Sequence, residues 1–161
     1  MTIKTGDKLP DAKLRVATED GPAWKTTEEL FQGKKVVLIG VPGAFTSTCH
    51  NAHLPGYLQT MDTLRQKGVS MVAVTAVNDL FVMEAWKRAS GADGKIEFLA
   101  DGNGDFAKAL GLTFDGSAVG LGLRSQRYSM LIEDGVVKQL NIETMPAKVA
   151  ASSAETLLSQ I

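Results

Sequence analysis

Cys49 is the one cysteine of the chain, and it follows a hydroxyl-rich segment that comes after an apolar run at 35–41. The run lacks polar alternation, which predicts a buried strand, and a helical pattern begins near Cys49. In the first turn of a helix, the dipole and the free N–H groups can lower the pKa of a thiol from about 8.5 to roughly 3.5–7.5. Cys49 is therefore a candidate nucleophile at neutral pH. A buried structural cysteine is the alternative, although the polar neighbours Thr46, Thr48 and His50 favour the reactive interpretation.

The residues around Cys49 discriminate between cysteine chemistries. A thioredoxin-type dithiol would need a second cysteine in place of Ala52, and a tyrosine-phosphatase loop would need an arginine in place of Pro55. A cysteine hydrolase would need a histidine base within reach of the thiol. His50 is adjacent to Cys49 and faces away, whereas His53 lies one helical turn further on and shares its face. We expect His53 to be a polar surface or subunit-contact residue.

The composition excludes several classes of partner. The 161 residues carry 17 basic and 18 acidic side chains, so no basic surface for nucleic acid is expected. The longest apolar run, at 36–45, is about half the roughly 20 residues that cross a bilayer, and no hydrophobic signal segment is found. One cysteine forms neither an internal disulfide nor a thiolate-rich zinc site, so no metal is expected. The sequence predicts a soluble, cytoplasmic protein without a nucleic-acid or membrane partner.

The apolar pattern and the turn signals predict one α/β domain over residues 1–161. We expect a parallel sheet with right-handed crossovers and an antiparallel hairpin at one edge, in a three-layer sandwich. An N-terminal hairpin should lie at an edge. The expected strands are 13–18, 23–26, 35–41, 69–76, 96–100, 127–132 and 136–142. Two short helices are expected, at 27–31 after a capping box at Thr26 and at 105–110. After Cys49 we expect a helix through Lys67 with a kink at Pro55 and Gly56, and then a helix capped by Asn78. The last expected helix runs from a capping box at Ser152 to Ile161, and 112–124 is an expected loop.

Several blocks of the sequence, which cover nearly the whole chain, form a family signature. They are Val41-Pro42-Gly43-Ala44-Phe45-Thr46-Ser47-Thr48-Cys49, His53-Leu54-Pro55-Gly56-Tyr57, Val77-Asn78-Asp79, Phe81-Val82-Met83, Ala85-Trp86, Gly120-Leu121-Gly122, Arg127-Tyr128-Ser129-Met130 and Asp134-Gly135. Together these blocks resemble the peroxiredoxins, specifically the type II or peroxiredoxin-5-like subfamily. The resemblance implies a thioredoxin-like three-layer α/β/α sandwich with a mixed central sheet and an N-terminal β-hairpin extension.

The resemblance also implies roles for the residues of the site. Cys49 is the expected nucleophile, Thr46 the hydroxyl that holds the peroxide, Pro42 the shield of the pocket, and Arg127 the cation beside the thiolate. Cleaving an O–O bond by in-line attack requires alignment of sulfur with both oxygens and stabilisation of the departing hydroxide or alkoxide. The always-charged Arg127 can serve both ends of that alignment. The expected substrate-binding residues of the same loop are Gly43 and Thr48.

The product of attack is a sulfenic acid on Cys49, which must be reduced to complete the cycle. Some relatives carry a second cysteine for this step, but the corresponding positions here hold Val74 and Ala151. The expected reductant is therefore an external thiol, with glutathione and glutaredoxin as first choice and thioredoxin as second. No cofactor is expected. Ser47 departs from the proline common at its place, which removes no reacting group.

The resulting functional prediction is a thiol peroxidase for hydrogen peroxide and small organic hydroperoxides. A redox-sensing or chaperone-like binding module with slow turnover is the alternative. The resemblance also implies a homodimer, formed by a face near the active-site loops. The glycine-rich apolar segment at 112–123 suits such a contact, and Phe45, Phe81 and Leu121 are further candidates for it.

Overall fold

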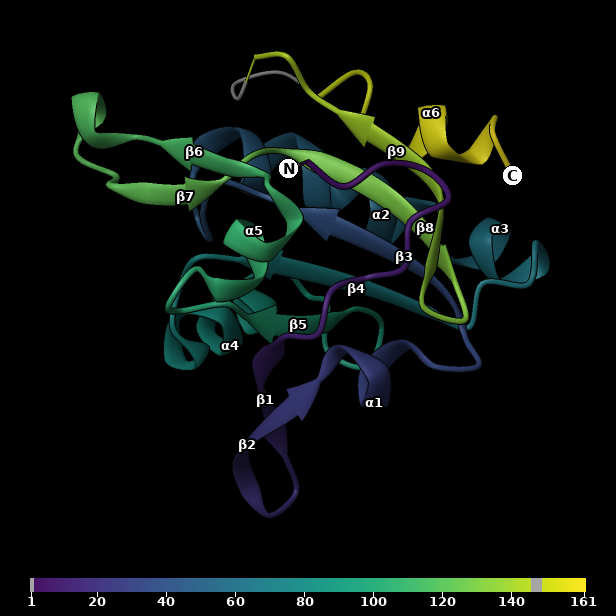
Figure 1. Cartoon of the computed structure of the whole chain (residues 1–161), viewed down its shortest axis with the longest axis horizontal. Coiled ribbons are helices and arrows are strands. Elements are labelled where there is room, and N and C mark those ends of the chain that lie inside the picture. The colour runs from purple at the N-terminus through teal and green to yellow at the C-terminus, as the bar shows by residue number, and fades with distance from the viewer. Residues whose placement is uncertain (1, 146–148) are drawn as a thin grey trace.

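The structure is a computed structural model that describes residues 2–145 and 149–161, with only the backbone described for Cys49 and Asn51. Its described residues form a seven-stranded sheet in the order β2-β1-β5-β4-β3-β8-β9 (Figure 1). The central strands β3, β4 and β5 are parallel, while β8 is antiparallel to β3 and to β9. The predicted mixed sheet is thus confirmed. The strands are β1 (Lys13–Thr18), β2 (Gly21–Thr26), β3 (Lys35–Gly40), β4 (Met71–Ala76), β5 (Glu97–Ala100), β8 (Tyr128–Glu133) and β9 (Val136–Ile142).

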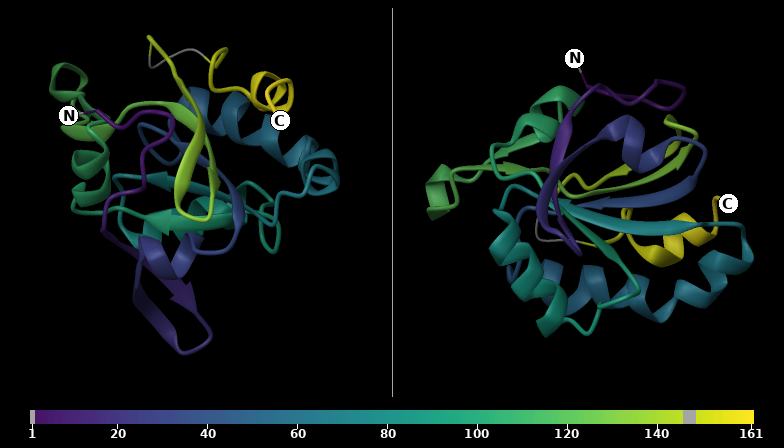
Figure 2. Two further views of the ribbon diagram at one scale, coloured as in Figure 1. Left: turned by 45° about the vertical axis from the view of Figure 1, so that its right-hand side comes forward. Right: turned by 90° about the horizontal axis from the view of Figure 1, so that it is seen from below.

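Helices cover both faces of the sheet, as Figure 2 shows most clearly in its right-hand view. Alternate residues of β3 enter two different cores: Val37 and Ile39 pack on one side, Val36 and Leu38 on the other. This explains why β3 is apolar without alternation from Val36 to Ile39, and it confirms the three-layer sandwich. One face carries α1 (Thr27–Phe31) and α5 (Asp105–Leu110). The other carries a π-helical turn (Cys49–His53), α2 (Leu54–Gln59), α3 (Met61–Gln66), α4 (Leu80–Ala89) and α6 (Ala154–Leu158).

The N-terminal hairpin forms one edge of the sheet, as predicted. Gly21, with φ +107°, begins β2 directly after the turn, in a conformation that favours glycine. The predicted capping box follows: the Thr26 hydroxyl accepts from the Glu29 amide at 3.1 Å, and the Glu29 carboxylate accepts from the Thr26 amide at 3.2 Å. Signals in the local sequence are therefore sufficient to predict the N-terminal hairpin and the start of α1.

The helical segment after Cys49 breaks elsewhere than expected. Pro55 lies in the first turn of α2, where its missing N–H breaks no hydrogen bond of that helix. The break between α2 and α3 falls at Thr60, which has φ −107° and ψ 9°. The prediction of a kink at Pro55 and Gly56 was wrong in position because a π-helical turn precedes Pro55 and gives α2 a new start there.

Two predicted caps are displaced by one residue. Asp79, not Asn78, caps α4 by accepting from the Val82 amide at 2.9 Å, and Ser153, not Ser152, caps α6. In both cases the neighbouring residue has a different polar partner. The Asn78 side-chain oxygen accepts from the amide of Ala44 at 2.9 Å.

The expected loop at 112–124 contains a small antiparallel hairpin, which extends beyond the main sheet (Figures 1 and 2). Its strands are β6 (Thr113–Asp115) and β7 (Leu123–Ser125), with a 3₁₀ turn at Ser117–Val119. Strands of three residues are too short to show alternation in the sequence, and the glycines of this segment indicated a loop instead. None of the helices in the described part of the chain has the length and apolarity that crossing a membrane requires.

Candidate active site

The candidate nucleophile follows the loop that leaves the carboxyl end of β3, a central strand. The Val41 amide donates to the Thr75 carbonyl at 3.1 Å, which extends the pairing with β4 just beyond Gly40. Gly40 faces the ring of Tyr128 on β8, and a Cβ added there would stand 2.0 Å from Tyr128 Cε1. Glycine is thus required at the strand end so that the ring can pack beneath the loop.

Hydrogen bonds within the loop hold Thr46 at the entrance to the helical segment. Its hydroxyl donates to the Gly43 carbonyl at 2.7 Å, and its own carbonyl accepts from the His50 amide at 2.9 Å. Phe45 takes the left-handed conformation, with φ 62°, and its side chain is exposed. A strained non-glycine residue at this turn shows that the surrounding contacts determine the loop conformation.

The loop borders a cavity of about 210 Å³, large enough for a peroxide. Cys49 begins the π-helical turn directly after Thr48 in the chain, and the position of its side chain lies outside the described part of the structure. Gly43 is buried and does not line the cavity, so the structure leaves its expected role in substrate binding without direct support. Four of the predicted site residues line the cavity: Pro42, Thr46, Thr48 and Arg127. The other lining residues are Ser47, Phe114, Val119 and Leu121.

Sequence reasoning missed two contributions of the β6–β7 hairpin. Phe114, Val119 and Leu121 give the cavity its apolar wall. Arg124 donates from Nε to the Leu121 carbonyl at 2.9 Å and from Nη1 to the Pro42 carbonyl at 3.3 Å, so it joins the hairpin to the loop. Its only sequence signal was its place at the end of a glycine-rich segment.

Arg127, just before β8, is 2% exposed and donates from Nη1 to Nδ1 of His53 at 3.0 Å. His53 is itself 1% exposed, so the expectation of a surface or subunit-contact histidine was wrong. Burial, reinforced by the Arg127 charge, lowers the pKa of His53 from 6.5 to about 4. Arg127 therefore meets a neutral acceptor that leaves its positive charge intact.

The C-terminal turn supports the other side of His53. Its Nε2 lies 3.0 Å from the Ser152 carbonyl oxygen, which also accepts from the Tyr57 hydroxyl at 2.7 Å. The Glu143 carboxylate accepts from the Ser152 amide at 2.7 Å and from its hydroxyl at 2.6 Å. Burial raises the pKa of Glu143, but these bonds outweigh it and leave the pKa below its ordinary value.

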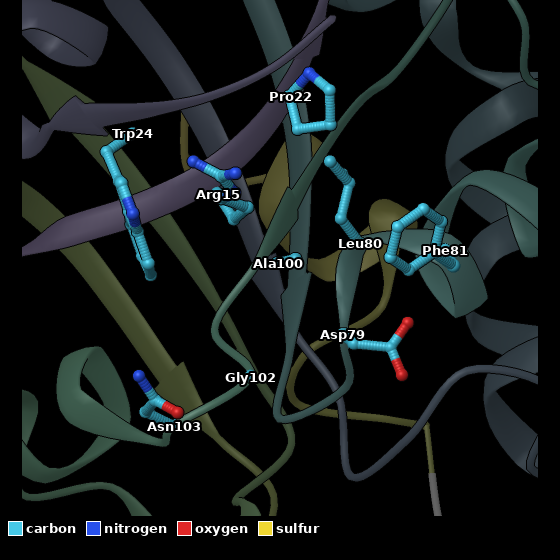
Figure 3. A pocket seen from close by; sticks show the side chains of 9 residues that line it. All are labelled: Arg15, Pro22, Trp24, Asp79, Leu80, Phe81, Ala100, Gly102 and Asn103. Atoms are coloured by element: carbon cyan, nitrogen blue, oxygen red, sulfur yellow. The ribbon is translucent and has the colours of Figure 1, made fainter.

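A second hollow of about 230 Å³ lies between the N-terminal hairpin, the start of α4 and the segment after β5 (Figure 3). The Arg15 guanidinium carbon lies 5.2 Å from the centroid of the Trp24 ring on its wall. None of the predicted site residues lines this hollow. Within the described residues, no group of three or more His, Cys, Asp or Glu side chains is placed to hold a metal ion.

Comparison with known proteins agrees with this geometry. The Redoxin family matches residues 4–158. The chain is 44% identical to chloroplastic Peroxiredoxin-2E of Arabidopsis thaliana over 99% of this chain and 70% of the relative. It is 42% identical to Peroxiredoxin-2C of Oryza sativa subsp. japonica over 99% of this chain and 98% of the relative.

Solved structures give the same result. Reduced Prx3 of Vibrio vulnificus in complex with hydrogen peroxide matches with a TM-score of 0.94 and 50% identity over 99% of both chains. The Plasmodium falciparum antioxidant protein, a 1-Cys peroxiredoxin, matches with a TM-score of 0.91 and 25% identity over 96% of both chains. The chain belongs to the peroxiredoxins of the thioredoxin-like superfamily. It is a thiol-dependent peroxidase.

Proposed function

We propose that this peroxidase works with one cysteine per chain and is recycled by an external thiol, glutathione with glutaredoxin in first place and thioredoxin in second. The observation that carries the proposal is that Cys49 is the one cysteine in the sequence. A sulfenic acid formed on Cys49 has no second thiol in its own chain with which to condense. The likeness to a structure described as a 1-Cys peroxiredoxin supports the same cycle.

The proposed chemical step takes place in the cavity beside the loop. The Cys49 thiolate attacks one peroxide oxygen, the O–O bond breaks, and the departing oxygen leaves as hydroxide or alkoxide and takes up a proton. Arg127, which lines the cavity, supplies positive charge where negative charge shifts during the attack. The Thr46 proton is engaged by the Gly43 carbonyl, so the hydroxyl oxygen is oriented to accept from the peroxide O–H. Thr48 adds a further hydroxyl to the cavity wall, and the Pro42 ring shields the pocket.

Mass spectrometry of the intact protein tests the cycle. After peroxide treatment with glutathione present, the proposal predicts a glutathione adduct at Cys49 that glutaredoxin removes. Without a thiol, excess peroxide should convert Cys49 to the sulfinic acid. A disulfide-linked dimer as the main oxidised product would instead show that Cys49 is resolved by its counterpart in another subunit.

Rapid-mixing kinetics with each reductant distinguish the two candidate donors. We expect faster recycling with glutathione and glutaredoxin than with thioredoxin at equal concentrations. Faster recycling by thioredoxin would reverse that order. No turnover with any of these thiols would contradict the external-thiol mechanism and favour a sensing role. The cytoplasmic location stays a prediction.

We further propose a homodimer formed through the apolar face near the loop. Phe81 is 79% exposed and Val119 is 73% exposed, while Phe45 and Leu123 are also exposed. Large apolar side chains that stay exposed in one chain are candidates for a subunit contact. Sedimentation at micromolar concentration should show a dimer, and a monomer would contradict this part of the proposal.

A further inference from the structure

We infer that His53 is a positioning residue for Arg127: the Ser152 carbonyl holds its imidazole as the Nε2–H tautomer, and its Nδ1 lone pair orients the guanidinium at the cavity. The inference rests on the proposed role of Arg127 in peroxide reduction. It concerns a residue that lines no part of the cavity and touches the site through another side chain.

Hydrogen-bond complementarity defines the tautomer. A backbone carbonyl can only accept, so the Nε2 atom at 3.0 Å from the Ser152 oxygen must carry the ring proton. A guanidinium can only donate, so the Nδ1 atom at 3.0 Å from Arg127 Nη1 must present its lone pair. Both contacts are satisfied by one neutral form of the imidazole. An imidazolium would place an N–H group against the Arg127 donor.

The two contacts of His53 belong to a closed ring of hydrogen bonds. Arg127 donates to His53, His53 donates to Ser152, and Ser152 donates to the Glu143 carboxylate through its amide and its hydroxyl. The Glu143 amide closes the ring by donating to the Arg127 carbonyl at 2.9 Å. All four residues are buried. The ring joins the helical segment after Cys49, the start of β8, the end of β9 and the turn before α6.

A neutral acceptor suits the function of the arginine. A guanidinium is a planar fork, so fixing Nη1 restricts the plane in which the remaining N–H groups point. A carboxylate in the place of His53 would also fix the plane, but it would neutralise much of the charge that the transition state needs. The imidazole orients Arg127 and leaves its charge for the thiolate and the departing oxygen. The low pKa of His53, caused by burial and by Arg127, keeps this arrangement in place at neutral pH.

Two variants separate the contacts of the ring. In His53→Asn the side-chain oxygen can occupy the place of Nδ1 and still accept from Arg127, whereas the contact with Ser152 is lost. In His53→Gln the amide nitrogen can reach the place of Nε2 and donate to Ser152, whereas the acceptor for Arg127 is lost. We expect the Asn variant to react with hydrogen peroxide within about threefold of the wild type, and the Gln variant to be slower by about tenfold or more.

The pKa of the Cys49 thiol is the second readout, measured from the pH dependence of its alkylation rate. A displaced guanidinium stabilises the thiolate less, so the thiol pKa should rise in the Gln variant by about one unit and change little in the Asn variant. In an Arg127→Ala background the two variants should react at the same rate. Circular dichroism and urea unfolding would first establish that each variant is folded.

Nitrogen NMR of the imidazoles in the wild-type protein keeps the inference testable if a variant does not fold. We expect His53 to be protonated at Nε2 alone at neutral pH, and an Nδ1–H tautomer or an imidazolium would overturn the inference. Equal rates and equal thiol pKa values in the Asn and Gln variants would also overturn it, with His53 then having a structural role. An inactive wild-type protein would instead refute the proposed function.

Discussion

Acidification should destabilise this chain through His53 well before most carboxylates titrate. The imidazole is buried against Arg127, Tyr57 and the nearby Glu143, and burial followed by the Arg127 charge lowers its pKa to about 4. In the unfolded chain the same group has the ordinary value of 6.5. Between these values the unfolded state binds more protons than the folded state, so the free energy of unfolding decreases as the pH falls. The contribution is fully present above about pH 6.5 and is lost toward about pH 4.

The size of the effect follows from the shift itself. The pKa of His53 falls from its ordinary value of 6.5 to about 4, which corresponds to a loss of about 3 kcal/mol in the free energy of unfolding once the group is fully protonated. Linkage places about 2 kcal/mol of this loss between roughly pH 8 and pH 5. A domain of this size is stable by only about 5–15 kcal/mol, so the loss is easily measured.

Urea unfolding at a series of pH values, followed by circular dichroism, measures this slope. His53→Asn is the matched control, because it keeps a polar side chain at the same place but has no titrating group there. Asp101, whose pKa is raised by burial, belongs to no contact of His53, so its titration cancels in the difference. The difference in slope between the two proteins should account for about 2 kcal/mol by about pH 5. If the free energy of unfolding depended on pH in the same way in both proteins, the reasoning would be refuted.

Three further predictions concern the strand end, the loop and the buried acid. Gly40→Ala would place a Cβ 2.0 Å from the Tyr128 ring, so urea unfolding should show a loss of about 2 kcal/mol or more, and an unchanged midpoint would contradict the packing described here. Thr46→Val removes the hydroxyl and should slow the reaction with hydrogen peroxide by at least about tenfold in stopped-flow measurements. Thr46→Ser keeps a hydroxyl and should retain most of the rate. Similar rates in both variants would exclude a role for the hydroxyl. Glu143→Gln should cost about 2 kcal/mol at neutral pH, since the carboxylate accepts three hydrogen bonds, two of them buried. Its pKa is lowered in the fold, so this difference should shrink as acid protonates the wild-type carboxyl, and a pH-independent difference would count against it.

Local signals in the sequence were sufficient where a structure depends on near neighbours. The capping box at Thr26 and Glu29 forms as its spacing predicts, and so does the unbroken apolar strand that becomes β3. Asn78 and Asp79 are both good capping residues, and sequence alone could not choose between them. The choice depends on the Ala44 amide, which engages Asn78 from a distant part of the chain.

The supporting residues of the site could not be predicted for the same reason. His53 looks like a surface residue because its partners, Arg127 and Ser152, are 74 and 99 residues away in the sequence. Arg124 reaches the loop through contacts with Pro42 that no spacing rule encodes. The lining residues Pro42, Thr46, Thr48 and Arg127 were expected at the site through the resemblance to a known family, and the cavity brings them together.

One rapid-mixing experiment tests the central claim most directly: the reduced protein and its Cys49→Ser variant are each mixed with an equivalent of hydrogen peroxide in the absence of any other thiol. Serine packs in nearly the same volume but provides no thiolate near neutral pH. The wild type should consume one peroxide per chain and gain the mass of a single oxygen atom, while the folded variant should consume none and keep its mass. Consumption of peroxide by the variant at the wild-type rate would contradict the account.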